Sequence, residues 1–163
     1  MQKIKSVQNV SSMCLICGVD NVLGMQMRFF ETEDGSLVGR FTGREEHQSY
    51  PGRMHGGMIC AILDEMIGRL LKLGDRDEWG VTAELSVRYR KPVPLGTELT
   101  VTAQITKESR KLLKGTAEIL LPDGTVAAEA SATYFKLSND EIASDVDIDD
   151  YWIPDTRPVP EMI

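Results

Sequence analysis

The chain has 163 residues, of which 42% are hydrophobic and 26% are charged, the composition of a single soluble globular domain. Its longest apolar run, residues 58–63, is far shorter than the roughly 20 residues that span a bilayer, and its N-terminus has no apolar block like that of a secretory signal. We therefore expect a cytoplasmic protein that does not enter the membrane. The formal net charge of −7 argues against nucleic acid as a partner.

The first 24 residues show no clear period, and their most distinctive feature is the CxxC pair Cys14 and Cys17. A single CxxC is a weak metal signal because structural zinc normally takes four ligands. We therefore expect two packed, reduced thiols and no metal. The only other Cys or His residues that could complete a zinc site are His47, His55 and Cys60.

Six short runs rich in β-branched and aromatic residues predict strands, and two of them have an apolar residue at every second position. Turn residues at 33–35 and 122–124 separate the first and the last pair, which predicts two hairpins. We therefore expect a hairpin followed, after a helix, by a four-stranded antiparallel meander. The predicted strands cover residues 26–31, 36–42, 81–90, 99–106, 112–121 and 125–136.

One segment has the period of a helix, from His55 to Gly74, and glycine is common at a helix end. Nearly all of its side chains are apolar except for a charged stripe of Glu65, Arg69 and Lys72, which we expect to face solvent. The helix should therefore lie in the core with the sheet wrapped around it. This order of elements predicts an α+β domain and excludes a parallel nucleotide-binding sheet.

Asp64 is unusual because its carboxylate leaves the helix on an apolar side, about 100° from Glu65. Either the helix is rolled so that Asp64 meets water, or the carboxylate is a general base or nucleophile in an apolar groove. The helix also opens with Gly56-Gly57, which lets a ligand oxygen approach backbone N–H groups at the positive end of the helix dipole. His55, just before this turn, is a candidate catalytic base or a capping residue.

These residues fall in the segment HQSYPGRMHGGMICAILDE, residues 47–65, which resembles the signature of hotdog-fold acyl-CoA thioesterases of the PaaI-like, phenylacetate-pathway branch. In that branch a His-Gly-Gly opens the central helix, and an acid follows nine residues after the His, which is the place of Asp64. The resemblance extends over residues 14–137. It includes CLICG before the first strand and YRKPVPLG after the third.

The resemblance divides the chain into three parts. A hotdog domain covers residues 25–137, preceded by an N-terminal extension, residues 1–24. The tail, residues 138–163, carries eight acids and one base and so accounts for the whole net charge. It has no periodic pattern, so we expect it to be disordered or loosely docked, unless the region around Trp152 anchors it on the domain or on a neighbouring subunit.

The resemblance also implies an acyl-CoA thioesterase without a cofactor, a homodimer or dimer of dimers whose active sites lie between two chains. Asp64 would activate water or attack the thioester carbon, and the backbone N–H of Gly56 would polarise the thioester oxygen. A Ser or Thr at the start of the third strand positions the water or the acid in this branch, and Thr82 matches it. Ser49 replaces the Asn or Gln that commonly stands six residues before the motif His, so the neighbouring Gln48 is the candidate for that role.

Coenzyme A carries phosphates, which the resemblance places near the later strands and their turns. Two other functions stay open: a hotdog hydratase or dehydratase that pairs His47 with Asp64, and a non-catalytic acyl-CoA-binding module. The sequence does not identify the acyl group. The candidates for substrate binding are Gly57 and the basic residues Arg88, Lys91, Arg110 and Lys111.

Overall fold

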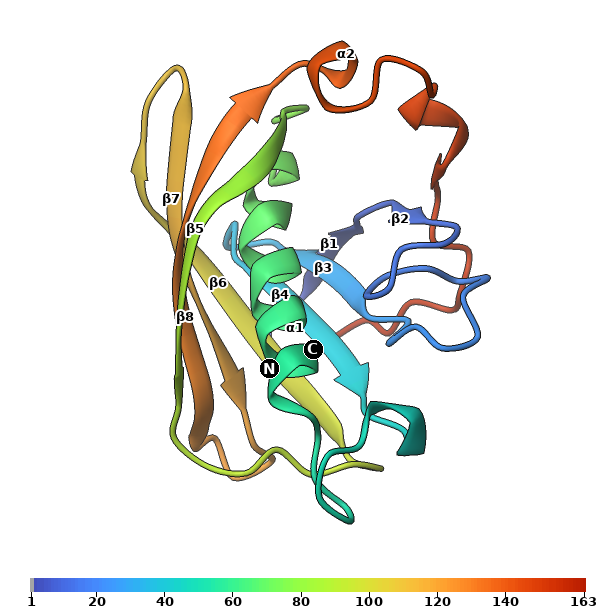
Figure 1. Ribbon diagram of the computed structural model, residues 1–163, viewed down its shortest axis with the longest axis vertical. Coiled ribbons are helices and arrows are strands. Elements are labelled where there is room, and N and C mark those ends of the chain that lie inside the picture. Colours follow the sequence, from blue (N-terminus) through green and yellow to red (C-terminus); the bar gives the residue numbers. More distant parts are fainter. Residues whose placement is uncertain (1) are drawn as a thin grey trace.

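One sheet of seven antiparallel strands wraps around a single long helix, α1 (Gly56–Gly68) (Figure 1). This computed structural model describes residues 2–163. The strand order across the sheet is β1-β3-β4-β6-β7-β8-β5, and β2 and β9 form a separate two-stranded ribbon. The predicted α+β class, with one antiparallel sheet around a central helix, is confirmed. The strands are β1 (Ile4–Val7), β2 (Val10–Ser11), β3 (Arg28–Thr32), β4 (Leu37–Thr42), β5 (Trp79–Tyr89), β6 (Glu98–Glu108), β7 (Leu112–Leu120), β8 (Val126–Leu137) and β9 (Trp152–Ile153), and the short helices are η1 (Glu45–His47), η2 (Arg69–Lys72), α2 (Asn139–Ile142) and η3 (Ile148–Asp150).

The four later strands of the sheet do not form a simple meander. β6, β7 and β8 follow one another, but β5 pairs with β8 at the edge of the sheet and not with β6. The connection after β5 crosses the end of the sheet because backbone hydrogen bonds tie it to the segment before α1. Met54 N–H donates to Val93 O at 2.9 Å, and Gly96 N–H donates to Gly43 O at 2.8 Å. The predicted four-stranded meander was therefore wrong for β5.

A β-bulge in β5 changes which side chains face the helix. The register with β8 shifts between Thr82 and Glu84, so the strict alternation expected along this strand is interrupted there. After the bulge, Leu85 and Val87 pack against the core, as their apolar character predicts. Before the bulge, Thr82 also faces α1, where its hydroxyl reaches Asp64. The bulge thus lets one strand present both a polar group and apolar groups to the same helix.

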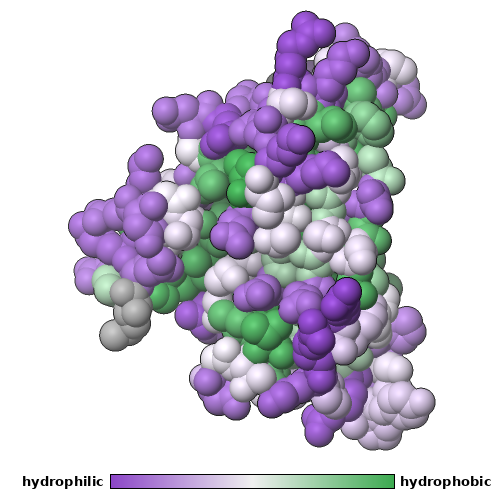
Figure 2. All heavy atoms as spheres, turned by 90° about the vertical axis from the view of Figure 1, so that its left-hand side faces the viewer, coloured by the Kyte–Doolittle hydropathy of each residue, from purple (hydrophilic) through white to green (hydrophobic). Residues whose placement is uncertain are grey.

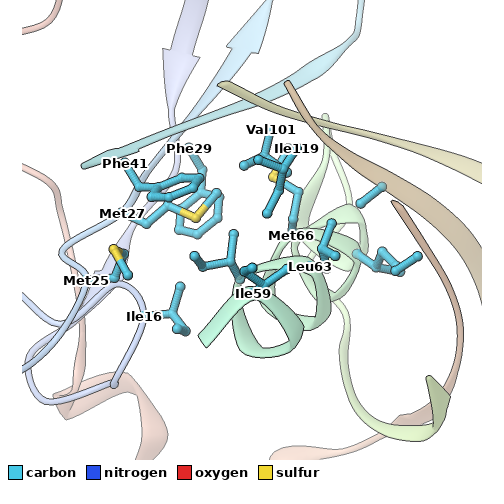
Figure 3. Close-up of a cluster of buried hydrophobic side chains, with 14 of the residues drawn as sticks. Ile16, Met25, Met27, Phe29, Phe41, Ile59, Leu63, Met66, Val101 and Ile119 are labelled. Carbon is cyan, nitrogen blue, oxygen red and sulfur yellow. The ribbon is translucent and has the colours of Figure 1, made fainter. Parts of the chain in front are cut away.

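The core lies between α1 and the concave face of the sheet. Met66 of α1 points toward Val101 of β6 and Ile119 of β7 (Figure 3). Full burial of an aliphatic side chain of this size stabilises the fold by about 1.5 to 3 kcal/mol, so this face of the helix holds the sheet around it. Among residues 2–163, no helix combines the length and the apolar character needed to cross a membrane. The buried residues of α1 are Ile59, Ile62, Leu63, Met66 and Ile67.

The charged stripe of the helix is covered instead of facing solvent. Arg69 is only 3% exposed, and its guanidinium carbon lies 4.1 Å from the ring centre of Phe29 and 4.4 Å from that of Trp152. Its Nε donates to Glu65 Oε1 at 2.8 Å, and its Nη1 donates to the carbonyl of Asn9 at 2.6 Å. The expected solvent stripe was wrong because both chain ends, whose docking leaves no periodic signal in the sequence, fold over this side of α1.

The C-terminal tail is docked on the domain. β9 pairs with β2 in an antiparallel ribbon, and the ring of Trp152 meets that of Trp79 edge to face, with 5.2 Å between centres. Further along, Asp155 accepts a hydrogen bond from Arg28 Nε at 2.8 Å. The expectation of a disordered or loosely docked tail was therefore wrong, and the alternative of an anchor around Trp152 is correct.

We expect the docking of the tail to weaken in acid. Burial alone would raise the pKa of Asp155, but hydrogen bonds from Arg157 and Arg28 outweigh it and the pKa is lowered. A carboxyl group with a lowered folded-state pKa stabilises the fold above its ordinary pKa of about 3.9, and this stabilisation is lost as the pH falls through the folded-state pKa. The fluorescence of the two tryptophans should therefore change below about pH 4.

Asp155→Asn tests this expectation at neutral pH. Removing the charge should lower the free energy of unfolding by about 1.5 to 3 kcal/mol, the usual contribution of hydrogen bonds to a charged group. Asp145→Asn, an exposed acid of the same tail, is the matched control and should change little. Equal stability of the Asp155→Asn and Asp145→Asn proteins at pH 7 would contradict the prediction.

Candidate active site

Asp64 lies between two hydroxyl groups from adjacent strands. Thr82 Oγ1 of β5 donates to Asp64 Oδ1 at 2.8 Å, and the hydroxyl of Tyr134 of β8 lies 2.7 Å from the same oxygen. The two donors come together because Thr82 and Tyr134 are direct partners across the β5–β8 pair. The bulge just after Thr82 places its side chain on this face, so strand pairing and helix position together build the site.

The two hydroxyls leave the Asp64 carboxylate oriented but not enclosed. Both donors reach Oδ1, and among residues 2–163 no hydrogen bond to Oδ2 is formed. The Asp64 side chain is half-buried, and it forms no salt bridge within residues 2–163. A carboxylate with one fixed oxygen and one open oxygen can accept a proton from a water molecule or attack an electrophilic carbon.

Tyr134 is the member of this site that the sequence analysis missed. It is 5% exposed, and its hydroxyl also lies 2.6 Å from the backbone carbonyl of Asp64, so its single proton is shared between two acceptors. Burial, and then the negative charge of Asp64, raise the pKa of Tyr134, so the hydroxyl keeps its proton and remains a donor. A tyrosine among the small apolar residues of the predicted last strand was the available signal.

The start of α1 assigns separate roles to His55 and the two glycines. His55 Nδ1 accepts a hydrogen bond from Gly57 N–H at 2.9 Å, which makes His55 the N-cap of the helix. This contact uses the N–H of Gly57 within the protein. Among residues 2–163, no hydrogen bond uses the N–H of Gly56, which sits at the positive end of the helix dipole. Gly56 is therefore the better placed of the two to receive a ligand oxygen.

Asp64 and Gly56 of one chain cannot act on the same small group. They are eight residues apart on one helix, which at the usual rise corresponds to about 12 Å along the axis. A thioester carbon and its oxygen are separated by a single bond length. A site that uses both the Asp64 carboxylate and the Gly56 N–H must therefore take them from two different chains.

The loop before α1 places two predicted residues away from Asp64. Gln48 is exposed, and its Oε1 accepts a hydrogen bond from Gly52 N–H at 2.9 Å, which closes the loop on itself. His47 is 2% exposed, its Nδ1 accepts from Arg44 N–H at 3.1 Å, and its Nε2 lies 2.9 Å from the carbonyl of Leu23. Because both ring nitrogens of His47 are engaged inside the protein, this histidine holds the loop in place.

The four predicted phosphate-binding residues do not gather in one chain. Arg88 lies at the end of β5, next to Tyr89, which pairs with Ala128 of β8. Lys111 lies near the other end of β8, where its carbonyl accepts a hydrogen bond from Lys136 N–H. These points are eight residues apart on β8, about 26 Å at the usual rise of a strand. Lys91 follows Arg88 at the first end, and Arg110 precedes Lys111 at the second. Figure 2 shows the outer face of the sheet as mainly polar, with separate apolar areas.

A cavity of about 380 Å³ opens beside the Asp64 carboxylate. Its floor includes the two hydroxyl donors of Asp64, and one wall is formed by the paired rings of Trp79 and Trp152. One of these rings belongs to β5 and the other to the docked tail. The cavity therefore combines an oriented carboxylate with an aromatic wall, and the tail helps to shape it.

The chain is similar to known thioesterases. The thioesterase superfamily model matches residues 51–128. Acyl-coenzyme A thioesterase THEM4 of Mus musculus is 32% identical over 110 residues, which cover 67% of this chain and 46% of that relative. Acyl-coenzyme A thioesterase 13 of Mus musculus is 26% identical over 111 residues, which cover 68% of this chain and 77% of that relative. The chain thus spans about half the length of the THEM4 relatives that it matches.

Solved structures agree with this match. A thioesterase superfamily protein has a TM-score of 0.68 at 29% identity, over 75% of this chain and 59% of that one. A Bacillus halodurans protein crystallised with CoA has a TM-score of 0.62 at 26% identity, over 71% of this chain and 76% of that one. The chain resembles the thioesterase superfamily and shares the hotdog fold of these structures, as the sequence analysis predicted. The assignment to the PaaI-like branch stays a prediction.

The contact between Tyr134 and Asp64 can be tested without any assumption about activity. Tyr134→Phe should lower the free energy of unfolding by about 1.5 to 3 kcal/mol because it removes a hydrogen bond to a charged group. In an Asp64→Ala background the cost should shrink, since only the bond to the backbone carbonyl remains to be lost. Chemical denaturation of the four proteins measures this coupling.

Tyr50→Phe is the matched control, because Tyr50 is 78% exposed and the same change should there have little effect. An equal cost of Tyr134→Phe in both backgrounds would show that Tyr134 does not hold the Asp64 carboxylate.

Proposed function

We propose that the protein is an acyl-CoA thioesterase that hydrolyses the thioester to a free acid and CoA. The observation that carries this proposal is the Asp64 carboxylate, fixed at one oxygen by Thr82 and Tyr134 and open at the other beside a cavity. Relatives named acyl-coenzyme A thioesterases and a similar structure solved with CoA support the choice of substrate. The reaction needs no cofactor in this scheme.

Asp64 supplies the chemistry in either of two ways. As a general base, its free oxygen removes a proton from water as the water attacks the thioester carbon; the C–S bond then breaks, and the CoA thiolate leaves and takes up a proton. As a nucleophile, the carboxylate attacks that carbon and displaces the CoA thiolate, and water then hydrolyses the resulting anhydride to release the acid and restore Asp64. The negative charge that develops on the thioester oxygen is stabilised by the Gly56 N–H at a helix N-terminus. Thr82 and Tyr134 are positioning residues because they act through Asp64.

The enzyme works as a homodimer in this proposal, as the resemblance implied. One support is the roughly 12 Å along α1 between Gly56 and Asp64, which requires the N–H of a second chain. The other is the free edge of β5, an eleven-residue strand that pairs with β8 on one side only and carries the exposed apolar side chain of Val81. The dimer of dimers and the cytoplasmic location stay predictions.

The substrate spans the two chains. The acyl group occupies the cavity beside Asp64, whose lining combines the Trp79 and Trp152 rings with charged side chains such as Lys72. Tyr89 donates to the carbonyl of Gly56 at 2.9 Å, so the end of β5 that carries Arg88 and Lys91 accompanies Gly56 of the second chain. Arg110 and Lys111, the pair at the opposite end of the sheet, then come from the first chain. Basic residues of both chains can therefore bind the CoA phosphates.

The two alternative functions have less support. A hydratase or dehydratase would need a histidine opposite Asp64, and His47 is buried with both ring nitrogens engaged. A non-catalytic acyl-CoA-binding module would have no use for a carboxylate that two hydroxyls orient beside a cavity.

The division of the chain into residues 1–24, 25–137 and 138–163 also stays a proposal. The first part contributes β1 to the folded unit, and the last part contributes β9.

We expect Asp64→Asn and Asp64→Ala to lower kcat at least about a hundredfold, the lower end of general-base contributions. CoA release, followed with a thiol reagent over short, branched, medium and aromatic acyl-CoAs, measures this effect on the substrate that the wild-type protein prefers. Thermal unfolding of each variant separates loss of chemistry from loss of fold.

Asp75→Asn, an exposed aspartate in the turn after η2, is the control for the same chemical change. Glu65→Ala is unsuitable because Glu65 pairs with the buried Arg69. Near-wild-type turnover by folded Asp64→Asn would remove Asp64 from the mechanism.

A further inference from the structure

Three side chains with metal-binding atoms meet where the N-terminal segment crosses α1, and the proposed reaction uses none of them. The sulfur atoms of Cys14 and Cys17 and a carboxylate oxygen of Glu65 all lie within 4.8 Å of one another. Counting only cysteine and histidine ligands, the sequence analysis expected no metal. The fold adds a third ligand type, because Glu65 comes from a helix about fifty residues later in the chain.

The backbone of the CxxC segment is folded around its sulfur atoms. The N–H groups of Ile16 and Cys17 point at Cys14 Sγ at 3.3 and 3.4 Å, and the N–H of Ser11 points at Cys17 Sγ at 3.3 Å. Backbone donors of this kind favour a negatively charged sulfur, the form in which cysteine binds a metal. The segment therefore holds both sulfur atoms in place through backbone hydrogen bonds before any ligand is bound.

Gly18 makes this arrangement possible. Its N–H donates to the carbonyl of Cys14 at 2.9 Å and closes the turn. A Cβ atom at this position would clash with the same carbonyl oxygen, which cannot move aside because it belongs to the backbone. Any residue larger than glycine would therefore open the turn and separate the two sulfur atoms.

Glu65 has one oxygen for a structural partner and one for the cluster. Its Oε1 accepts from Arg69 Nε at 2.8 Å, whereas its Oε2 lies 3.8 Å from Cys14 Sγ. The cluster is shielded, since Cys17 is 1% exposed and Cys14 is half-buried. Two thiolates and the carboxylate would carry three negative charges, and Arg69 beside them supplies one positive charge. A divalent cation would bring this group to neutrality.

We propose that Cys14, Cys17 and Glu65 bind one Zn²⁺ ion. Thiolate ligands select zinc over magnesium and calcium, and three protein ligands with water in the fourth place form a known zinc coordination. On binding, the thiol protons leave to solvent and the sulfur atoms bond to the metal, without any oxidation or reduction. The ion links the N-terminal segment to α1 at the residue next to Asp64, so it stabilises the covered side of that helix.

Cobalt substitution tests the ligands directly. Co²⁺ added to the reduced, full-length protein should give an intense thiolate-to-cobalt charge-transfer absorption that saturates at one equivalent, and Zn²⁺ should displace it. Cys14→Ser and Cys17→Ser should each lose most of this absorption, and Glu65→Gln should bind Zn²⁺ at least about tenfold more weakly. Cys60→Ser is the matched control because Cys60 lies on another side of α1, against the hydroxyl of Tyr89.

Three results would overturn the proposal. The first is that Co²⁺ gives no charge-transfer absorption with the wild-type protein, and the second is that the absorption persists in Cys14→Ser and Cys17→Ser. The third is that thiol counting finds a Cys14–Cys17 disulfide in protein that has not been exposed to an oxidant. The first result needs no variant, so it holds even if a substitution prevents folding. None of these measurements depends on thioester hydrolysis, so failure of the metal site can be distinguished from failure of the proposed function.

Discussion

The two hydroxyl contacts to one oxygen of Asp64 are the constraint on which the site depends. They exist because α1 lies against the β5–β8 pair, because Thr82 and Tyr134 are cross-strand partners, and because a bulge turns Thr82 toward the helix. Loss of any of these features would remove one or both donors from a half-buried carboxylate, which is costly. The same contacts leave the second oxygen free, so the features that make the buried acid tolerable also orient it for reaction.

The chain ends complete what the central domain begins. Arg69 lies between Phe29 of the sheet and Trp152 of the tail, and the tail adds that tryptophan to the wall of the cavity beside Asp64. The N-terminal segment covers the neighbouring side of the helix, with Asn9 accepting from Arg69. The buried guanidinium therefore joins the tail, the N-terminal segment and α1, and it connects the stability of the tail to the shape of the candidate acyl site.

Local patterns predicted the helix, the strands and Asp64 because each depends on residues close in sequence. The helical period located α1, and a carboxylate on its apolar side marked Asp64. Features that depend on distant contacts gave no such signal: β5 was placed beside β6, Arg69 was expected to face solvent, and Tyr134 was missed because its role depends on the register with Thr82. The four basic residues were close in sequence, yet the fold separates them into two pairs. The contribution of Glu65 to the cysteine cluster likewise could not be predicted from the spacing of residues in the sequence.

The central claim is that an acyl-CoA thioester lies between Asp64 of one chain and the Gly56 N–H of another. A crystal structure of the Asp64→Asn protein with its preferred acyl-CoA unhydrolysed tests this claim most directly. The account predicts a dimer in which the thioester oxygen accepts a hydrogen bond from Gly56 N–H of the second chain and the thioester carbon lies about 3 to 3.5 Å from the residue 64 side chain, or from a water that it holds. A thioester bound away from residue 64, or within a single chain, would contradict it.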